Sequence, residues 1–417
     1  MYPNPQDVVP LPARPDLAQY RKQAKDLSSA CKTRGRDGVR EWAKRWMADA
    51  GDQFIEFAWT RLSSGSCALS DAQFAIARAY GFLSWPTFVH HVEDLRRADG
   101  QVSAFEAAAD AIVAGDRPML ERLLAGDPSL IRVRSTHEHR STLLHYVAAN
   151  GVENYRQKTP KNVVEIADVL LRAGSDVDAG ADMYGGDATT LGLAATSIHP
   201  LRAGVQNALI DLLLDYGADM EHRGGSGRDV SIVNGCLANG RGEAAAHLAR
   251  RGATLDLESA CGVGRLDLVE RYFNEDGTLQ PGATAVQMRD GFGWACEFGR
   301  TDVVEYLLQK GFDVATKSLR NHGQTGLHWA ASGGHADVVR LLLDRGAPLE
   351  AADDSFDATP LSWALYGWSN EPRATRERYY PVVRLLVEAG AHVKSEWIEH
   401  PEICADERMV AALTVRG

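Results

Sequence analysis

The sequence contains no apolar run that approaches the roughly 18 residues needed to cross a bilayer. Its first residues, MYPNPQDVVPLPARP, lack the basic start and apolar stretch of a secretory signal, so we expect a soluble, cytoplasmic protein. Basic residues are also in deficit, because 45 Lys and Arg stand against 56 Asp and Glu, a net charge of -11. A broad nucleic-acid surface needs an excess of cations. The composition therefore predicts neither a membrane span nor a nucleic-acid partner.

Paired cysteines and catalytic motifs are equally scarce. No two of the six cysteines have the C-x-x-C spacing, and we interpret them as reduced thiols, mostly buried, in a cytosolic protein. They are Cys31, Cys67, Cys236, Cys261, Cys296 and Cys404. The sequence has no phosphate-binding loop with its Lys-Ser/Thr, no G-x-S-x-G and no H-E-x-x-H. We therefore predict no catalytic residue and no cofactor, and the sequence leaves any enzymatic activity open.

What the sequence does contain is a recurring pair of short helices. In the segment that begins at Gln324, QTGLHWAASGGHADVVRLLLDRGAPLEAAD, an apolar helical face is interrupted by Gly333 and Gly334. A second, more apolar helix over 338–343 ends before Gly346, which is expected to adopt the left-handed conformation that terminates helices.

Glycines occupy the same place after the second helix along most of the chain. They are Gly174, Gly217, Gly252, Gly277, Gly311, Gly346 and Gly390. They are spaced by 43, 35, 25, 34, 35 and 44 residues. A period near 33 with two short helices and a turn is typical of the ankyrin repeat. TGLH at 325–328 and TPLS at 359–362 resemble the T-P-L-H start of that repeat, and TLLH at 142–145 is a looser match. The resemblance covers about residues 102–414. It implies an all-α ankyrin-repeat solenoid of about eight units over 101–417, in which neighbouring units share one core.

Residues 1–100 do not follow this period and predict a small helical bundle of about five helices. Four of the nine tryptophans fall here, which indicates a core of its own: Trp42, Trp46, Trp59 and Trp85. The stretch LSDAQFAIARAYGFLSWPTFVHHVEDL resembles the helical segment that precedes the array in many bacterial ankyrin-repeat proteins. We expect this domain to cap the first repeat, because the ends of a solenoid need covering.

Three repeats carry inserted residues between their two helices, at 151–161, 197–207 and 367–380. In the ankyrin family this loop borders the concave face, and loops on a rigid scaffold often carry function. Arginine suits carboxylates or phosphates, and Tyr and Trp supply contact area. The predicted rim of a binding groove comprises Tyr155, Arg156, Lys158, His199, Arg202, Trp368, Arg373, Arg376, Arg378 and Tyr379. The alternative is that these loops are tolerated surface insertions with solvated charges.

Aromatic residues also occur on the first helices. Phe298 and Tyr366 follow the helix position that faces the concave side in ankyrin proteins, and we predict that both contact a partner. Trp294, Trp329 and Trp363 share one equivalent position, which we interpret as core packing rather than a stacking platform.

The histidines offer a weak metal-site candidate. His137 and His139 are separated by one residue on an expected hairpin tip, a spacing that zinc can use, but the sequence shows no third ligand. Exposed tip residues are therefore the preferred interpretation. His145 and His328 match the structural histidine of the ankyrin family, whose ring ties neighbouring loops together by hydrogen bonds.

Two functions remain open at this stage. The first is a protein–protein interaction scaffold that binds a partner, possibly acidic, on its concave face and fingertips. The second is a small-molecule binding protein or enzyme in which the inserted loops close a pocket for a small anionic ligand, with Asp182, His199 or Glu371 as acid or base. Self-assembly through residues 1–100 is a third reading.

Overall fold

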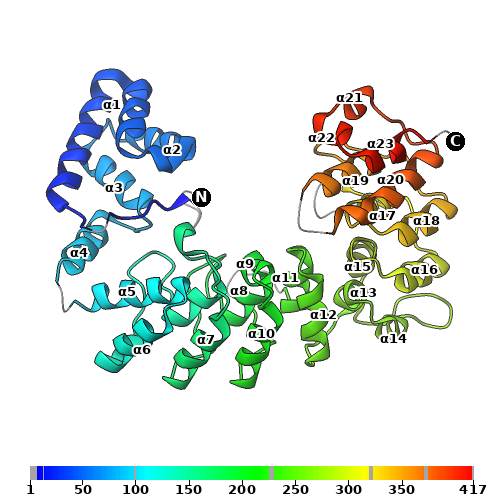
Figure 1. Ribbon diagram of the computed structural model, residues 1–417, viewed down its shortest axis with the longest axis horizontal. Helices are drawn as coiled ribbons and strands as arrows, with labels where there is room; N and C mark the ends of the chain where they lie inside the picture. Colours follow the sequence, from blue (N-terminus) through cyan, green and yellow to red (C-terminus); the bar gives the residue numbers. More distant parts are fainter. Residues whose placement is uncertain are drawn as a thin grey trace. The chain divides into compact units, whose positions relative to one another are not determined.

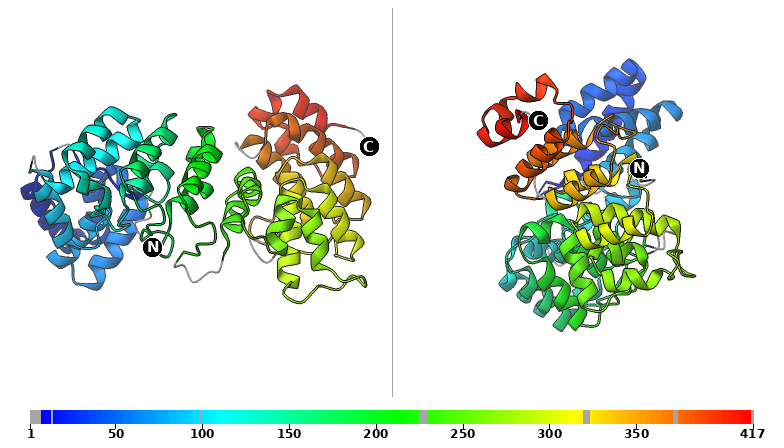
Figure 2. Two further views of the ribbon diagram at one scale, coloured as in Figure 1. Left: turned by 90° about the horizontal axis from the view of Figure 1, so that it is seen from below. Right: turned by 90° about the vertical axis from the view of Figure 1, so that its right-hand side faces the viewer.

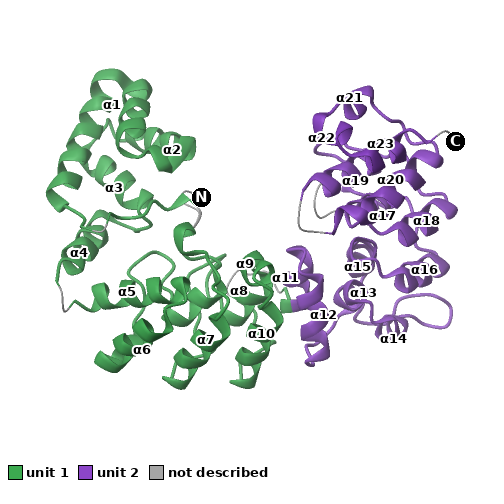
Figure 3. Ribbon diagram, in the orientation of Figure 1, with its two compact units in different colours: residues 1–232 green, residues 233–417 purple. Residues whose placement is uncertain are grey.

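The computed structural model describes residues 7–12, 14–97, 100–224, 230–318, 323–370 and 374–415. Over this part of the chain the regular elements are helices, and strand-like pairing is limited to three isolated bridges. The all-α prediction is therefore confirmed. The chain divides into two compact units, 1–232 and 233–417 (Figure 3).

The first helices of unit 1 precede the repeats. They are α1 (Leu17–Trp46), α2 (Gly51–Ser64), α3 (Leu69–Ala79) and α4 (Trp85–Leu95). The side chain of Asp16 caps α1, and Gly35, with φ of 55°, interrupts that helix where it kinks. Phe54, Phe82 and Phe88 are fully buried between these helices. Of the four expected core tryptophans, Trp42 is buried and the others are half-buried against the same core. That residues 1–100 form a separate domain stays a prediction, since unit 1 extends to residue 232.

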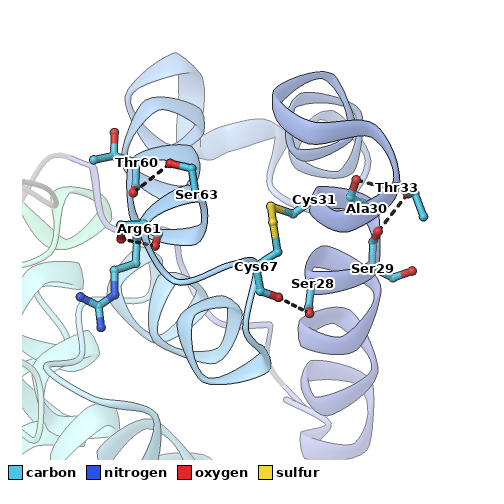
Figure 4. Close-up of a disulfide and its surroundings, with 10 residues drawn as sticks. Ser28, Ser29, Ala30, Cys31, Thr33, Thr60, Arg61, Ser63 and Cys67 are labelled. Carbon is cyan, nitrogen blue, oxygen red and sulfur yellow. Dashed lines mark hydrogen bonds between the residues drawn. A yellow bond between two sulfur atoms is a disulfide. The ribbon is translucent and has the colours of Figure 1, made fainter.

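A disulfide in this region was not expected. Cys31 of α1 is bonded to Cys67, which lies just beyond α2, and their Cα atoms are 5.8 Å apart (Figure 4). Ser28 Oγ donates a 2.6 Å hydrogen bond to the Cys67 carbonyl oxygen beside the bond. The prediction of reduced thiols is therefore wrong for this pair. Its two members are 36 residues apart in no recognisable motif, and it is the packing of α1 that brings them together.

The remaining cysteines are thiols in unit 2. Cys236, Cys261 and Cys296 are buried, as predicted, and Cys404 is exposed. Burial raises the pKa of the Cys236 thiol to about 12, so this group stays protonated and behaves as a small core residue.

Helix pairs follow one another in both units (Figures 1 and 2). In unit 1 they are α5 (Gln101–Ala114), α6 (Arg117–Gly126), a 3-10 helix (Leu143–Ala148), α7 (Val163–Arg172), α8 (Thr190–Thr196), α9 (Ile198–Arg202) and α10 (Gln206–Asp215). From the boundary onward they are α11 (Ile232–Ala238), α12 (Gly242–Arg250), α13 (Leu257–Val263), α14 (Leu266–Val269), α15 (Ala285–Glu297), α16 (Thr301–Gln309), α17 (Gly326–Ser332), α18 (Ala336–Asp344), α19 (Pro360–Ser369) and α20 (Tyr379–Glu388). Three short helices close unit 2: α21 (Ser395–Ile398), α22 (Pro401–Cys404) and α23 (Glu407–Leu413).

Left-handed glycines and threonine caps explain why the helices are short. The seven predicted terminating glycines all have positive φ, between 79° and 102°. At the start of α17, the Thr325 N–H donates to His328 Nδ1 at 3.1 Å, so the opposite nitrogen, Nε2, donates to the Ala358 carbonyl in the next repeat at 3.1 Å. Thr142 and His145 form the same arrangement, with His145 Nε2 3.2 Å from the Ala188 oxygen. These contacts confirm the predicted structural histidines.

The tryptophans of unit 2 lie in a row along the first helices. The ring centroids of Trp294 and Trp329 are 6.1 Å apart, and those of Trp329 and Trp363 are 6.2 Å apart. Trp294 and Trp329 are buried and Trp363 is half-buried. Trp294 and Trp329 belong to the core, as predicted, whereas Trp363 lies at its edge.

Candidate functional site

The described residues of the insertion at 367–380, which are 367–370 and 374–380, pack against the last repeats instead of forming a free rim. Trp368 is 2% exposed, and the Arg376 guanidinium lies 4.6 Å from its ring centroid while pairing with Glu402. Tyr379 is fully buried, and its hydroxyl donates a 2.8 Å hydrogen bond to the Ser332 carbonyl oxygen. Contrary to the prediction, neither Trp368 nor Tyr379 presents its ring to a partner. Both side chains pack in the interior, although the sequence pattern predicted them to be exposed.

A shallow hollow of about 320 Å³ lies at the start of α16 and α18. Exposed Arg378 lines it and donates through Nη2 to His335 Nδ1 at 2.9 Å. The other nitrogen of His335 donates to the Glu297 carbonyl at 2.7 Å. Burial and the nearby Arg378 lower the pKa of His335 to about 4, so this ring is neutral at pH 7.

Two residues of the predicted pocket, Arg373 and Glu371, lie outside the described residues. Asp182 is exposed and His199 half-buried in unit 1. The structure therefore gives no support to the hypothesis that these side chains act as an acid or a base in a pocket.

Exposed aromatic side chains mark one surface of unit 2. Tyr366 on α19 is 58% exposed, and its ring centroid is 6.0 Å from that of Trp363. Trp363 Nε1 donates to Asp353 Oδ2 at 2.8 Å, and the other oxygen of Asp353 accepts the Phe356 N–H at 2.7 Å. Phe356 is 68% exposed. Asp353 thus holds the ring of half-buried Trp363 and the backbone of exposed Phe356. We call these two residues and Tyr366 the aromatic surface (Phe356, Trp363 and Tyr366).

Phe298 is a less accessible member of the predicted set. It is half-buried, and a Cβ placed on Gly242 would come within 2.5 Å of its ring, so the ring lies against the start of α12. Its ring also lies 6.3 Å from that of Trp294. Phe298 therefore contributes mainly to packing between repeats.

The insertion at 151–161 folds inward. Arg156 is 4% exposed, its Nε donates to Asp110 Oδ1 at 2.8 Å, and its Nη1 pairs with Glu106 Oε2. The expectation that Arg156 reaches a partner is contradicted, because two carboxylates of α5 hold it. Tyr155 is half-buried, with its ring 5.4 Å from the same guanidinium. In the insertion at 197–207, Arg202 remains exposed at the end of α9.

A buried polar cluster lies behind this insertion. It consists of His91, Glu106, His137, His139, Glu153 and Arg156. His137 is 3% exposed and the His139 side chain 11% exposed, so the expectation of solvated tip residues is wrong. Their rings are parallel, with centroids 5.7 Å apart. Glu153, 1% exposed, places Oε1 3.2 Å from His137 Nε2 and 3.3 Å from His139 Nε2.

Burial and charge set the protonation states in this cluster. Burial disfavours the charged form of Glu153, but His137, His139 and Arg156 outweigh it and hold the pKa of this carboxyl well below its ordinary value. Burial, with the added influence of His137 and Arg156, lowers the pKa of His91 to about 3. Burial also lowers the pKa of His137, although Glu153 and Glu106 act in the opposite direction. Glu153 is therefore ionised and His91 is neutral at pH 7.

Sequence reasoning missed Phe356, His91, Glu106 and Glu153. Phe356 stands alone in the polar stretch DDSFDA, which is a readable signal for an exposed anchor. His91 and Glu106 gave no such signal, since they belong to ordinary amphipathic helices and meet His137 only through the packing of unit 1.

Comparison with known proteins supports the repeat assignment. Residues 257–353 and 292–396 match the family model described as ankyrin repeats (3 copies). This part of the chain is therefore built of ankyrin repeats, a module that generally mediates protein–protein interaction.

Similar structures and curated sequences add little beyond this. The ankyrin repeat domain of human ASB11 is similar to 69% of this chain over 99% of its own length, with 22% identity and a TM-score of 0.32. A search of curated proteins finds no significant match. None of the described helices is both long and apolar enough to cross a membrane.

Proposed function

We propose that the chain is an interaction scaffold that binds a protein partner on the aromatic surface of its ankyrin repeats. The observation that carries this proposal is the 58% exposure of Tyr366 on the first helix of its repeat. Exposed large aromatic side chains are costly to hydrate and are enriched at the energetic centres of interfaces. Phe356, 68% exposed, extends the same surface.

The aromatic surface is held in place before any partner arrives. Asp353 is 4% exposed and bonds to both the Phe356 backbone and the Trp363 indole. Burial opposes its ionisation, but the N–H groups of Phe356, Trp363 and Ser355 hold the pKa of Asp353 below its ordinary value. An ionised Asp353 keeps this network intact at neutral pH. Because these residues are already ordered, less conformational entropy is lost when a partner binds.

The contact is expected to be aromatic rather than ionic. Several arginines predicted to rim a groove have acidic partners inside the chain, with Arg156 bound to Glu106 and Asp110 and Arg376 bound to Glu402. Arg202 and Arg378 remain exposed. An interface centred on Tyr366 would depend weakly on ionic strength, whereas one centred on arginines would weaken steeply with salt.

The test compares wild type with Y366A and F356A. Full-length chain is immobilised, proteins retained from an extract of the source organism are quantified by mass spectrometry, and the affinity of each retained protein is then measured. Loss of a central aromatic anchor is expected to cost about 2 kcal/mol, a roughly 30-fold rise in Kd. Raising the salt concentration is expected to change Kd much less than either substitution.

The matched control is Y216A, which removes an exposed tyrosine at the C-cap of α10, the second helix of a unit 1 repeat. It is expected to retain the same partner with unchanged affinity. If the Y366A/F356A double variant binds every retained protein as wild type does, the aromatic surface is not the binding site.

A further inference from the structure

We propose that His91, Glu106 and His137 form a binding site for a divalent transition-metal ion, of which Zn²⁺ is the best fit. One potential ligand atom from each of these three buried residues lies within 4.8 Å of the other two. His91 comes from α4, Glu106 from α5 and His137 from the hairpin loop between the first two repeats. The site would therefore join the leading helices to the start of the repeats within unit 1.

One pair of proposed ligand atoms lies close to the separation that a bound metal ion requires. His137 Nε2 lies 4.0 Å from Glu106 Oε1. Ligand atoms around tetrahedral zinc, each about 2.0–2.2 Å from the ion, are roughly 3.4 Å apart. The two groups thus need to approach by about half an ångström, which side-chain rotation supplies.

Hydrogen bonds from neighbouring residues orient the proposed ligands, as they do at known metal sites. His91 Nδ1 is 2.6 Å from Thr136 Oγ1, which fixes the ring and leaves Nε2 for coordination. Arg156 Nη1 holds Glu106 Oε2, and the other oxygen, Oε1, is buried without a hydrogen-bond partner. A buried polar atom without a partner is rare in folded proteins. A bound cation would satisfy this one.

The charge of the cluster also favours a cation. Two carboxyl side chains, Glu106 and Glu153, lie beside the single guanidinium of Arg156. Neutral imidazole with carboxylate is a donor set that suits zinc and neighbouring transition metals. Glu153 Oε2 is likewise buried without a hydrogen-bond partner, so a fourth group stands next to the proposed ligands.

A proton shared between His137 and Glu153 is the competing explanation. Their 3.2 Å contact would suit an imidazolium–carboxylate pair. A shared proton would leave Glu106 Oε1 without a hydrogen-bond partner, whereas a bound metal ion would satisfy it.

The test uses full-length protein stripped with a chelator and titrated with Zn²⁺ in competition with a chromophoric indicator. We expect one tight site per chain and a higher thermal midpoint when zinc is present. Co²⁺ in its place is expected to give visible d–d bands without thiolate charge-transfer absorption, because the ligands are nitrogen and oxygen. That spectrum separates this site from adventitious binding at Cys404.

The variants H91A, E106Q and H137A are expected to abolish the tight site. T136V, which removes only the hydroxyl behind His91, is expected to weaken zinc binding by about tenfold. The matched control is H90A, because His90 is the exposed neighbour of His91 on the same helix. It is expected to bind zinc like wild type.

Two results would overturn the proposal. One is folded wild-type protein that binds no zinc more tightly than the indicator does. The other is tight binding that E106Q and T136V leave unchanged, which would place the ion elsewhere. Because both substitutions are nearly isosteric, circular dichroism can verify their folding even where H137A fails to fold.

Discussion

At the scale of single residues, Arg156 was expected on the surface but has a structural role in the interior. Its guanidinium is buried and contacts Glu106, Asp110 and, at 3.5 Å, Glu153. These carboxylates raise the pKa of Arg156 despite its burial, so it is always charged. Removing it would leave buried carboxylates without compensation, a situation far more costly than the loss of an exposed ion pair.

We therefore expect R156M to lower the free energy of unfolding by about 3–5 kcal/mol, measured by urea denaturation. R202M, an exposed arginine in the neighbouring insertion, is the control and is expected to change stability by less than about 0.5 kcal/mol. Adding E106Q to R156M should recover part of the loss, because one uncompensated charge is then removed. Equal stabilities of R156M and R202M would show that the buried network contributes little.

The sequence could not reveal this role. Arg156 lies in an 11-residue insertion with Pro, Lys and Tyr, a composition typical of exposed loops, and its acidic partners stand 46 and 50 positions earlier. Helical periodicity says which residues face inward on one element. It does not say which inward-facing polar residues of two distant elements will meet. The burial of His137 and the pairing of Cys31 with Cys67 were missed for the same reason.

At the scale of elements, close packing between successive first helices depends on small residues. A Cβ placed on Gly367 of α19 would lie 2.6 Å from the Tyr379 ring and 2.7 Å from the Ser332 carbonyl oxygen. Both neighbours are buried, and one is backbone. By contrast, a Cβ on Gly293 of α15 would meet the Trp329 ring at 3.6 Å, an ordinary contact.

These two glycines give opposite expectations for the same substitution. G367A is expected to destabilise unit 2 by about 1–3 kcal/mol, because overpacking outweighs the higher helix propensity of alanine. G293A is expected to be neutral or to stabilise by up to about 1 kcal/mol. Urea denaturation followed by tryptophan fluorescence measures both. A stabilising G367A would mean that α19 has room to move away from α17.

The repeats themselves were largely predictable at this scale. Terminating glycines and the Thr-x-x-His pattern are local, and each residue type has a direct conformational reason to be where it is. The insertions were located correctly, but their conformations were not foreseen. In 197–207 the inserted residues form α9, and the Gln206 side chain donates to three carbonyls of α8 and its end.

At the scale of the whole molecule, buried neutral histidines link stability to pH. His91 and His145 are essentially unexposed, and burial lowers the pKa of the first to about 3 and of the second to about 4. Burial also lowers the pKa of His137, His328 and His335. An unfolded chain takes up these protons near pH 6.5, before the folded chain does. Stability is therefore complete above about pH 6.5 and is lost as the pH falls from there toward 4.

At pH 5, His91 and His145 are each expected to lower the free energy of unfolding by about 2 kcal/mol relative to pH 7.5. Urea midpoints measured at pH 7.5, 6 and 5 should fall accordingly. H90A, at an exposed position, should leave the profile unchanged. A flat profile over this range would show that the buried rings become protonated without unfolding, which would contradict their neutral, desolvated state.

The contact from His328 Nε2 to the Ala358 carbonyl also bears on how this chain can be shortened for crystallography or binding assays. A fragment that stops before residue 358 would lack the Ala358 carbonyl. The buried N–H of His328 would then have no hydrogen-bond acceptor, which would destabilise the interior of the last repeat as well as exposing its end. Cut points are better chosen after a complete helix pair together with the following loop, and the same rule applies around His145 and Ala188.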